Sequence, residues 1–152
     1  MKKNIPKSNK KGVALVYVII VLVVVTLFST LVVNHVYRNL QQAKYQEQVL
    51  QAYYLSVSGT DLCLAALLQE GTGGEDDTLL YMQFNQSIAT PSPLTDTLGL
   101  DGGSVYLTVS ATTREGERWI VIESKAVLHD TSVSKTTYLD FLYSNPLIQL
   151  KR

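Results

Sequence analysis

The chain has 152 residues, with thirteen basic and thirteen acidic side chains and a single cysteine. This length accommodates one folded domain and an anchoring segment. One cysteine excludes an intrachain disulfide. Because the chain has no basic surplus, we do not expect non-specific nucleic-acid binding, which requires clustered Lys and Arg.

The N-terminal part has the pattern of a basic leader followed by a membrane span. Residues 1–12, MKKNIPKSNKKG, contain five lysines and no acid, and residues 13–33 are 21 residues without charge, Pro or Gly. About 20 apolar residues cross a bilayer, and in lipid the backbone must satisfy its own hydrogen bonds, so we expect a transmembrane helix. The basic flank predicts a single pass through the cytoplasmic membrane with the N-terminus inside and the remainder outside.

A cleaved secretory signal explains this start less well. Such signals have an apolar core of about 7–15 residues followed by small residues at the cleavage site. Here the apolar run is longer and ends in Val33-Asn34-His35. Removing residues 1–12 takes away five lysines and leaves eight basic against thirteen acidic residues, a net charge of −5.

The helix is predicted to continue without a break through residues 34–70, which contain no Pro and only Gly59 as a glycine. One apolar stripe follows steps of three and four: Val36, Leu40, Ala43, Leu50, Tyr54, Val57, Leu64 and Leu68. A second apolar group beside it comprises Tyr45, Val49, Ala52, Leu55, Gly59, Leu62 and Ala66. The apolar face therefore widens after Leu50, as a packed sheet requires. A coiled coil is the competing interpretation, which Glu47 and Asp61 weaken.

Four residues of this helix have specific interpretations. Gly59 costs about 1 kcal/mol relative to Ala in a helix, so we expect another backbone to approach it closely. The Tyr53-Tyr54 pair is interpreted as core packing rather than as a ligand platform. Cys63 is interpreted as a small apolar residue on a helix face rather than as a reactive thiol.

Residues 71–103 are predicted to be a loop region with one short helix. Gly71-Thr72-Gly73-Gly74 ends the long helix. Asp76 or Asp77 is the predicted N-cap of a helix from Thr78 to about Ala89. A calcium site at residues 75–77 is the alternative, but the acids do not alternate as in a calcium loop. Residues 91–93 and 98–103 are predicted loops.

Residues 104–144 alternate between apolar and polar side chains, which predicts an antiparallel sheet. Strands are expected at about residues 105–112, 119–128 and 133–143, joined by short turns into a meander. One sheet face should cover the outer half of the long helix. Residues 145–152 are predicted to be a tail. The expected fold class is therefore α+β, with one long N-terminal helix and a C-terminal antiparallel meander packed on its outer half.

Two stretches of residues 7–69 resemble the type IV pilin and pseudopilin superfamily. Lys10-Lys11-Gly12 followed by Val13-Ala14-Leu15-Val16 is similar to the pilin leader junction. Residues 51–59, QAYYLSVSG, with Leu62 and Ala65-Ala66, resemble the helical signature of PilX-type minor pilins. The resemblance implies that a prepilin peptidase cleaves between Gly12 and Val13 and methylates Val13. It also implies that other pilins pack against the helix, with Tyr17, Tyr53, Tyr54 and Gly59 in the helix bundle.

Tyr17 departs from the pattern of major pilins. Most of them have a glutamate five residues after the cut, where this chain has Tyr17. A carboxylate in lipid is costly and is kept only for function. Its absence argues against a bulk filament subunit and for a minor pilin that primes assembly or sits at the tip.

The sequence offers no catalytic constellation and no metal or cofactor motif. The two histidines, His35 and His129, are far apart in the sequence. We therefore expect a non-enzymatic protein, a minor pilin or pseudopilin of a type IV pilus, type II secretion or competence filament. The alternative is a single-pass, membrane-anchored envelope protein, uncleaved at Gly12, whose outer domain binds a partner.

Overall fold

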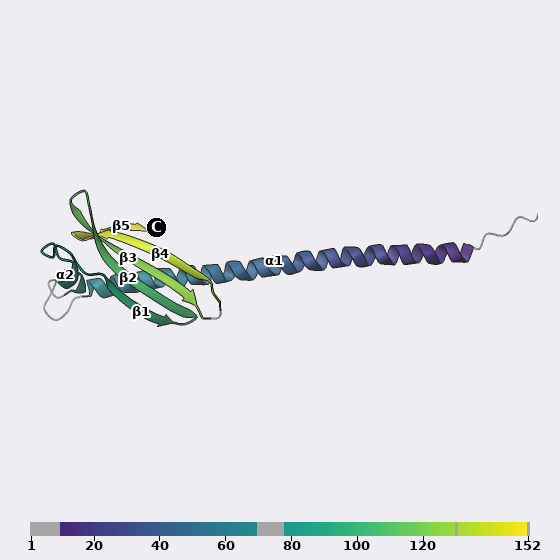
Figure 1. Cartoon of the computed structure of the whole chain (residues 1–152), viewed down its shortest axis with the longest axis horizontal. Coiled ribbons are helices and arrows are strands. Elements are labelled where there is room, and N and C mark those ends of the chain that lie inside the picture. Colours follow the sequence, from purple (N-terminus) through teal and green to yellow (C-terminus); the bar gives the residue numbers. More distant parts are fainter. Residues whose placement is uncertain (1–9, 70–77, 130, 152) are drawn as a thin grey trace, which may run out of the picture. The chain divides into compact units, whose positions relative to one another are not determined.

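The computed structural model describes residues 10–69, 78–129 and 131–151 (Figure 1). The chain divides into two compact units, Met1–Lys44 and Tyr45–Arg152. Helix α1, Lys10–Leu68, contributes residues to both units. The second unit adds a short helix, α2, Leu79–Phe84, and a five-stranded antiparallel sheet. The predicted α+β fold is confirmed.

Helix α1 has 59 residues and runs unbroken, as the absence of Pro predicts. It begins three residues before the predicted start at Val13 and ends one residue before Gln69. Gly12 therefore lies within its first turns.

The sheet has the strand order β1-β2-β3-β4-β5, which is a simple meander. Its strands are β1 Leu94–Leu100, β2 Gly103–Arg114, β3 Glu117–Leu128, β4 Ser134–Leu142 and β5 Asn145–Lys151. The central three strands lie where the alternation predicts them. The turn at Glu115-Gly116 is also confirmed, since both residues have positive φ, 55° and 84°, in the two-residue connection of β2 to β3.

Both edge strands were missed by the sequence prediction. The predicted loop at residues 98–103 is wrong because β1 pairs with β2 through residue Leu100, which lies opposite Gly103. Asp101-Gly102, with Gly102 at φ 94°, is the two-residue turn between these strands. The predicted tail at residues 145–152 is wrong because β5 pairs with β4, and Pro146 is tolerated on an edge strand.

Helix α2 is shorter than predicted and starts later. Thr78 is its N-cap, and its side-chain oxygen accepts a hydrogen bond from the Tyr81 amide at 3.1 Å. The predicted caps Asp76 and Asp77, and with them the calcium alternative, lie outside the described residues. The helix ends at Phe84 rather than near Ala89, because Asn85 leaves the helical conformation and accepts a bond from the Ser87 amide.

The core lies between the sheet and residues 52–67 of α1. Its sheet residues are those predicted by the alternation, including Val105, Leu107, Val109, Ile120, Ile122, Leu139 and Phe141. On α1 the buried positions are Ala52, Ser56, Gly59, Thr60, Cys63 and Leu67. Only Ala52 and Gly59 of this buried face belong to the second predicted apolar group, and none of its residues belongs to the first. Leu50 and Tyr54 of the first predicted stripe are exposed by 54% and 65%.

Candidate functional site

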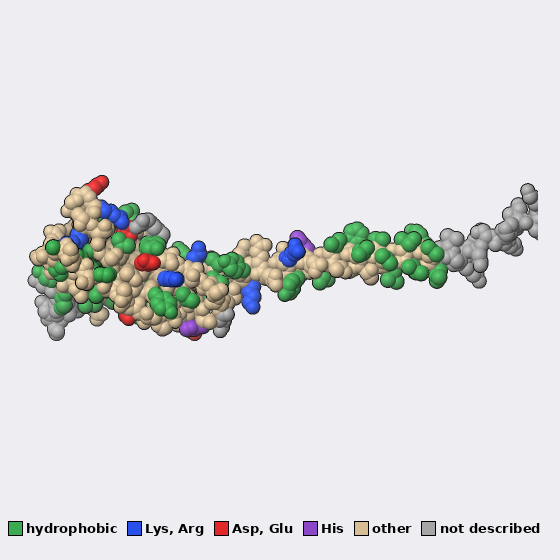
Figure 2. Space-filling view, viewed as in Figure 1, with side chains coloured by type: hydrophobic (Ala, Val, Ile, Leu, Met, Phe, Trp, Pro, Cys, Tyr) green, Lys and Arg blue, Asp and Glu red, His purple; other side chains and the backbone are tan. Residues whose placement is uncertain are grey.

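The first candidate feature is the apolar part of α1. Within the described residues one helix, near the N-terminus, is long and apolar enough to cross a membrane. Every residue from Ala14 to Val33 is exposed in this chain, and hydrophobic side chains cover much of this segment in Figure 2. Such a surface is unfavourable in water and suits lipid or other apolar helices.

The polar side chains of this segment are satisfied within the helix. The Thr26 hydroxyl donates to the carbonyl of Val23 at 2.8 Å. Ser29 and Thr30 donate to the carbonyls four residues earlier, both at 2.9 Å. Each hydroxyl thus has a partner without water, as a position inside a bilayer requires.

The predicted processing junction, Gly12-Val13, is helical and follows directly on the start of α1 at Lys10. The helix therefore begins before the junction, three residues earlier than the predicted start at Val13. Tyr17, the position occupied by glutamate in most major pilins, is 69% exposed on the apolar part of α1.

Tyr53 and Tyr54 do not form part of the core, so the core-packing interpretation is wrong for both side chains. They are 45% and 65% exposed and meet edge to face, with ring centroids 5.7 Å apart. Their exposure leaves both rings available for contacts with another chain.

Gly59 is buried, and the close approach that its helical position predicts is present. A Cβ atom at Gly59 would lie 2.5 Å from Val105 Cγ1 and 2.7 Å from Ser124 Oγ. The atoms closest to Gly59 therefore belong to side chains of β2 and β3, whereas the sequence predicted the approach of another backbone. Gly59 brings the chain's own sheet onto α1.

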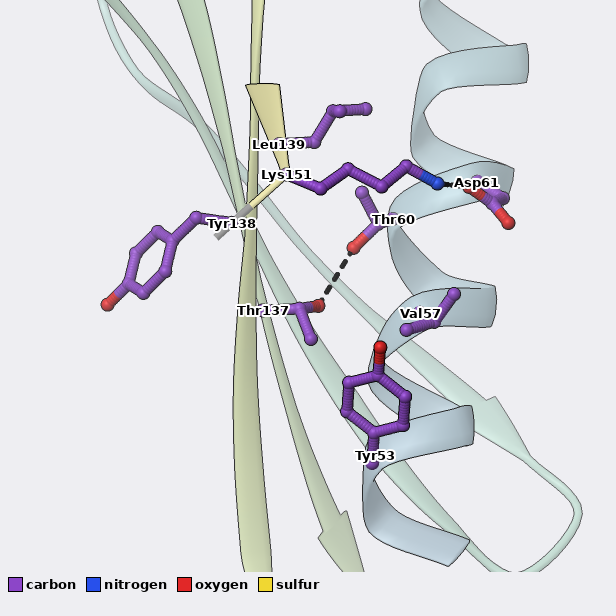
Figure 3. A pocket seen from close by; sticks show the side chains of 8 residues that line it. All are labelled: Tyr53, Val57, Thr60, Asp61, Thr137, Tyr138, Leu139 and Lys151. Atoms are coloured by element: carbon purple, nitrogen blue, oxygen red, sulfur yellow. Dashed lines mark hydrogen bonds and ion pairs between the residues drawn. The ribbon is translucent and has the colours of Figure 1, made fainter. Parts of the chain in front are cut away.

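A small cavity of about 170 Å³ lies between this part of α1 and the end of the sheet (Figure 3). In its wall the hydroxyls of Thr60 and Thr137 form a hydrogen bond of 3.1 Å. Lys151 Nζ of β5 lies 3.7 Å from Asp61 Oδ1 of α1, with both side chains largely exposed. The Tyr53 ring forms another wall, while Tyr138 points away from the cavity in Figure 3. These contacts join β4 and β5 to α1.

A larger apolar groove, of about 440 Å³, runs along β1 between α1 and α2. Its lining includes Leu62, Cys63, Leu79, Leu94, Asp96 and Leu98. Burial, with a smaller contribution from the Asp96 charge, raises the pKa of Cys63 from 9.0 to about 11. The thiol is therefore protonated near neutral pH, in agreement with its interpretation as an apolar side chain.

Sequence reasoning missed two arginine clusters in the outer unit. Arg114 forms a 2.8 Å ion pair with Asp140, a fully buried carboxylate, and lies over the Trp119 ring. Arg118 donates to the carbonyls of Phe84, Asn85 and Ile88. Nothing in the local sequence signals the hydrogen-bonded and ion-paired partners, which lie 26 or more positions away. Both clusters hold the fold together.

In residues 10–69, 78–129 and 131–151, no group of three His, Cys, Asp or Glu side chains is placed to hold a metal ion. Comparison of the chain with protein-family models and with curated protein sequences found no match. The fold, a long apolar N-terminal helix with an antiparallel sheet on its C-terminal part, is compatible with that of pilins.

Proposed function

We propose that this protein is a minor pilin or pseudopilin of the PilX type, serving a type IV pilus, a type II secretion system or a competence filament. The observation that carries the proposal is the continuity of α1. One unbroken helix holds both a fully exposed apolar segment and the small-residue face on which the sheet packs. A helix of this kind can leave lipid for a bundle of like helices while its sheet stays folded.

Assembly begins with the chain stored in the cytoplasmic membrane. The lysines of residues 1–12 hold the junction on the cytoplasmic side, and the sheet lies outside. A prepilin peptidase cuts after Gly12 and methylates Val13. The helix then exchanges lipid contacts for helix contacts within the filament. Exposed Tyr17, Tyr53 and Tyr54 are the side chains that we assign to those contacts.

Gly12 suits the cleavage because it is the residue that most easily leaves the helix. Glycine weakens a helix interior by roughly 0.5–1 kcal/mol relative to Ala and presents no side chain to the peptidase. The tyrosine at position 17 supports a priming or tip role over that of a bulk subunit. The role is one of assembly rather than catalysis.

The proposal is tested by the mass of the protein in membranes of cells with an active prepilin peptidase. The wild-type chain should begin at Val13, with the added mass of one methyl group. Gly12→Val should accumulate a precursor that still carries residues 1–12, because a branched side chain obstructs the cut and removes the backbone freedom of glycine.

Gly99→Val is the matched control. A Cβ at Gly99 meets no atom within 4 Å, and Val is favoured in a strand, so this variant should be processed normally. If the wild-type chain keeps its leader in these cells, the pilin assignment is wrong. The chain is then a simple anchored envelope protein with a partner-binding outer domain.

A further inference from the structure

The two outer strands of the sheet differ in charge and in exposure. Among the strands that the structure describes, β1 pairs only with β2 and β5 pairs only with β4. β1 contains the acid Asp96 and no base, whereas β5 contains the base Lys151 and no acid. Leu147 of β5 is 89% exposed. An edge strand with such an apolar side chain is a template for pairing with another chain.

Backbone groups on both edges are held by side chains near them in the sequence. The Thr97 amide donates to Asp96 Oδ1 at 2.8 Å, and the Leu147 amide donates to Asn145 Oδ1 at 3.2 Å. Side-chain bonds of this kind occupy backbone groups that a neighbouring strand would otherwise pair. When another strand pairs with the edge, these amides can exchange their side-chain bonds for backbone bonds at little cost in free energy.

The faces of the two edges are also matched. Residues opposite each other in an antiparallel sheet share a face. Lys151 lies opposite Leu139 and Gln149 opposite Phe141, so Lys151 and Gln149 are on the core face. Asp96 lies opposite Leu107, which places Asp96 on the core face of β1. The exposed base of β5 and the exposed acid of β1 therefore share one face.

We propose that the β5 edge of one copy of this protein pairs with the β1 edge of a second copy and continues the sheet from one outer unit to the next. Leu147, 89% exposed on β5, is then the apolar side chain that packs beside β1, where an apolar groove is lined by Leu62, Leu79, Leu94 and Leu98. Lys151 lies on the same face as Asp96 of the second copy. The ion pair between Lys151 and Asp61 spans 3.7 Å and joins two exposed side chains, so it is weak. The Lys151 side chain can therefore turn toward the second copy.

This contact is head-to-tail, because it joins two different edges. The proposal concerns the outer units alone and is independent of leader removal.

Crosslinking in membranes tests the edge pairing with the full chain. Two differently tagged copies, both carrying Cys63→Ala, are co-expressed, one with Thr97→Cys and the other with Ile148→Cys. These are the central residues of β1 and β5, so they meet whether the strands run parallel or antiparallel. A bismaleimide of about 8 Å reach also covers the diagonal neighbours, which lie about 7–8 Å apart.

A covalent dimer carrying both tags is the expected product. Adding Leu147→Asp to the Ile148→Cys copy should lower its yield about tenfold, because it removes the apolar anchor and places an acid beside Asp96. Replacing Thr97→Cys by Lys125→Cys is the control. Lys125 is exposed on the central strand β3, away from both edges, and should give no two-tag dimer.

Two results overturn the pairing. One is the absence of a two-tag dimer when Trp119 fluorescence shows that both variants are folded. The other is a predominant dimer between two Ile148→Cys copies, which means that β5 pairs with itself. The mass of the uncrosslinked chain reports leader removal in the same sample, so failed edge pairing and failed processing are read separately.

Discussion

Gly59 sets the distance between α1 and the sheet. The sheet residues that face it, Val105 and Ser124, are both buried, and Ser124 Oγ has no hydrogen-bond partner within the described residues. An unpartnered buried hydroxyl costs about 1–3 kcal/mol. The packing around Gly59 is therefore tight, and the hydroxyl facing it lies where no water reaches.

Gly59→Ala should lower the free energy of unfolding by roughly 1–3 kcal/mol, although Ala is the better helix former, because the new methyl group overpacks the interface. Urea unfolding of the full chain in detergent micelles measures this. Trp119, the only tryptophan, reports the outer unit.

Ser58→Ala is the control for this substitution. Ser58 is exposed on the neighbouring helix position, so its replacement should change stability by less than about 0.5 kcal/mol. If Gly59→Ala and the wild type are equally stable, the sheet can move away from α1 at no cost in free energy. That result would contradict the tight packing at Gly59.

Helix α2 depends on a strand that is distant in the sequence. Six residues are too few for a helix to be stable alone. The Arg118 guanidinium of β3 donates to the Phe84 carbonyl at 3.0 Å and to the Ile88 carbonyl at 2.8 Å. The planar fork of arginine can serve several carbonyls at once, which a lysine ammonium on its flexible stem cannot.

Arg118→Lys should therefore loosen α2 and the segment after it while leaving the central strands intact. We expect amide hydrogen exchange in residues 79–88 to become about tenfold faster, the equivalent of about 1.4 kcal/mol. Exchange in β3 away from residue 118 should not change. Arg38→Lys makes the same chemical change at an exposed position of α1 and should have no effect there. Unchanged exchange in residues 79–88 of Arg118→Lys would show that apolar contacts alone hold α2.

The hydrophobic core of the described residues belongs entirely to the second unit. The buried apolar residues run from Ala52 to Leu142, whereas Ala14 to Glu47 are exposed throughout. The core is closed by the C-terminal part of α1, which covers the sheet face containing Val105, Ile120 and Ile122. This unit therefore contains both partners of its core, the sheet face and the helix segment that covers it.

A fragment of residues 45–152 should accordingly be soluble and unfold in one cooperative transition by Trp119 fluorescence. A fragment of residues 78–152 is the control and should not fold, because its sheet would expose its apolar face to water. A non-cooperative transition of the longer fragment would mean that residues 1–44 contribute to the stability of the outer unit.

Features that depend on local physics can be read from the residues alone. Twenty-one uncharged, mostly apolar residues without Pro or Gly dictate a helix that suits lipid, and the polar continuation has no Pro. Alternation located β2 and β3, which bury one face and so show the period of two, and the Leu139 and Phe141 pair of β4 follows the same spacing. Gly59 was correctly predicted to mark a close approach, since a helical glycine needs such a reason.

Other features depend on contacts between segments that are distant in the sequence, and local patterns do not predict them. The buried stripe of α1 contains Ser56 and Thr60, whose hydroxyls bond to helix carbonyls and so need no water, and hydrophobicity alone could not select it. The edge segments β1 and β5 form strands because their backbones pair with β2 and β4. Their side chains are largely exposed, so their sequences show only a weak alternation of apolar and polar residues. Burial against a partner far along the chain, rather than local propensity, determines these elements.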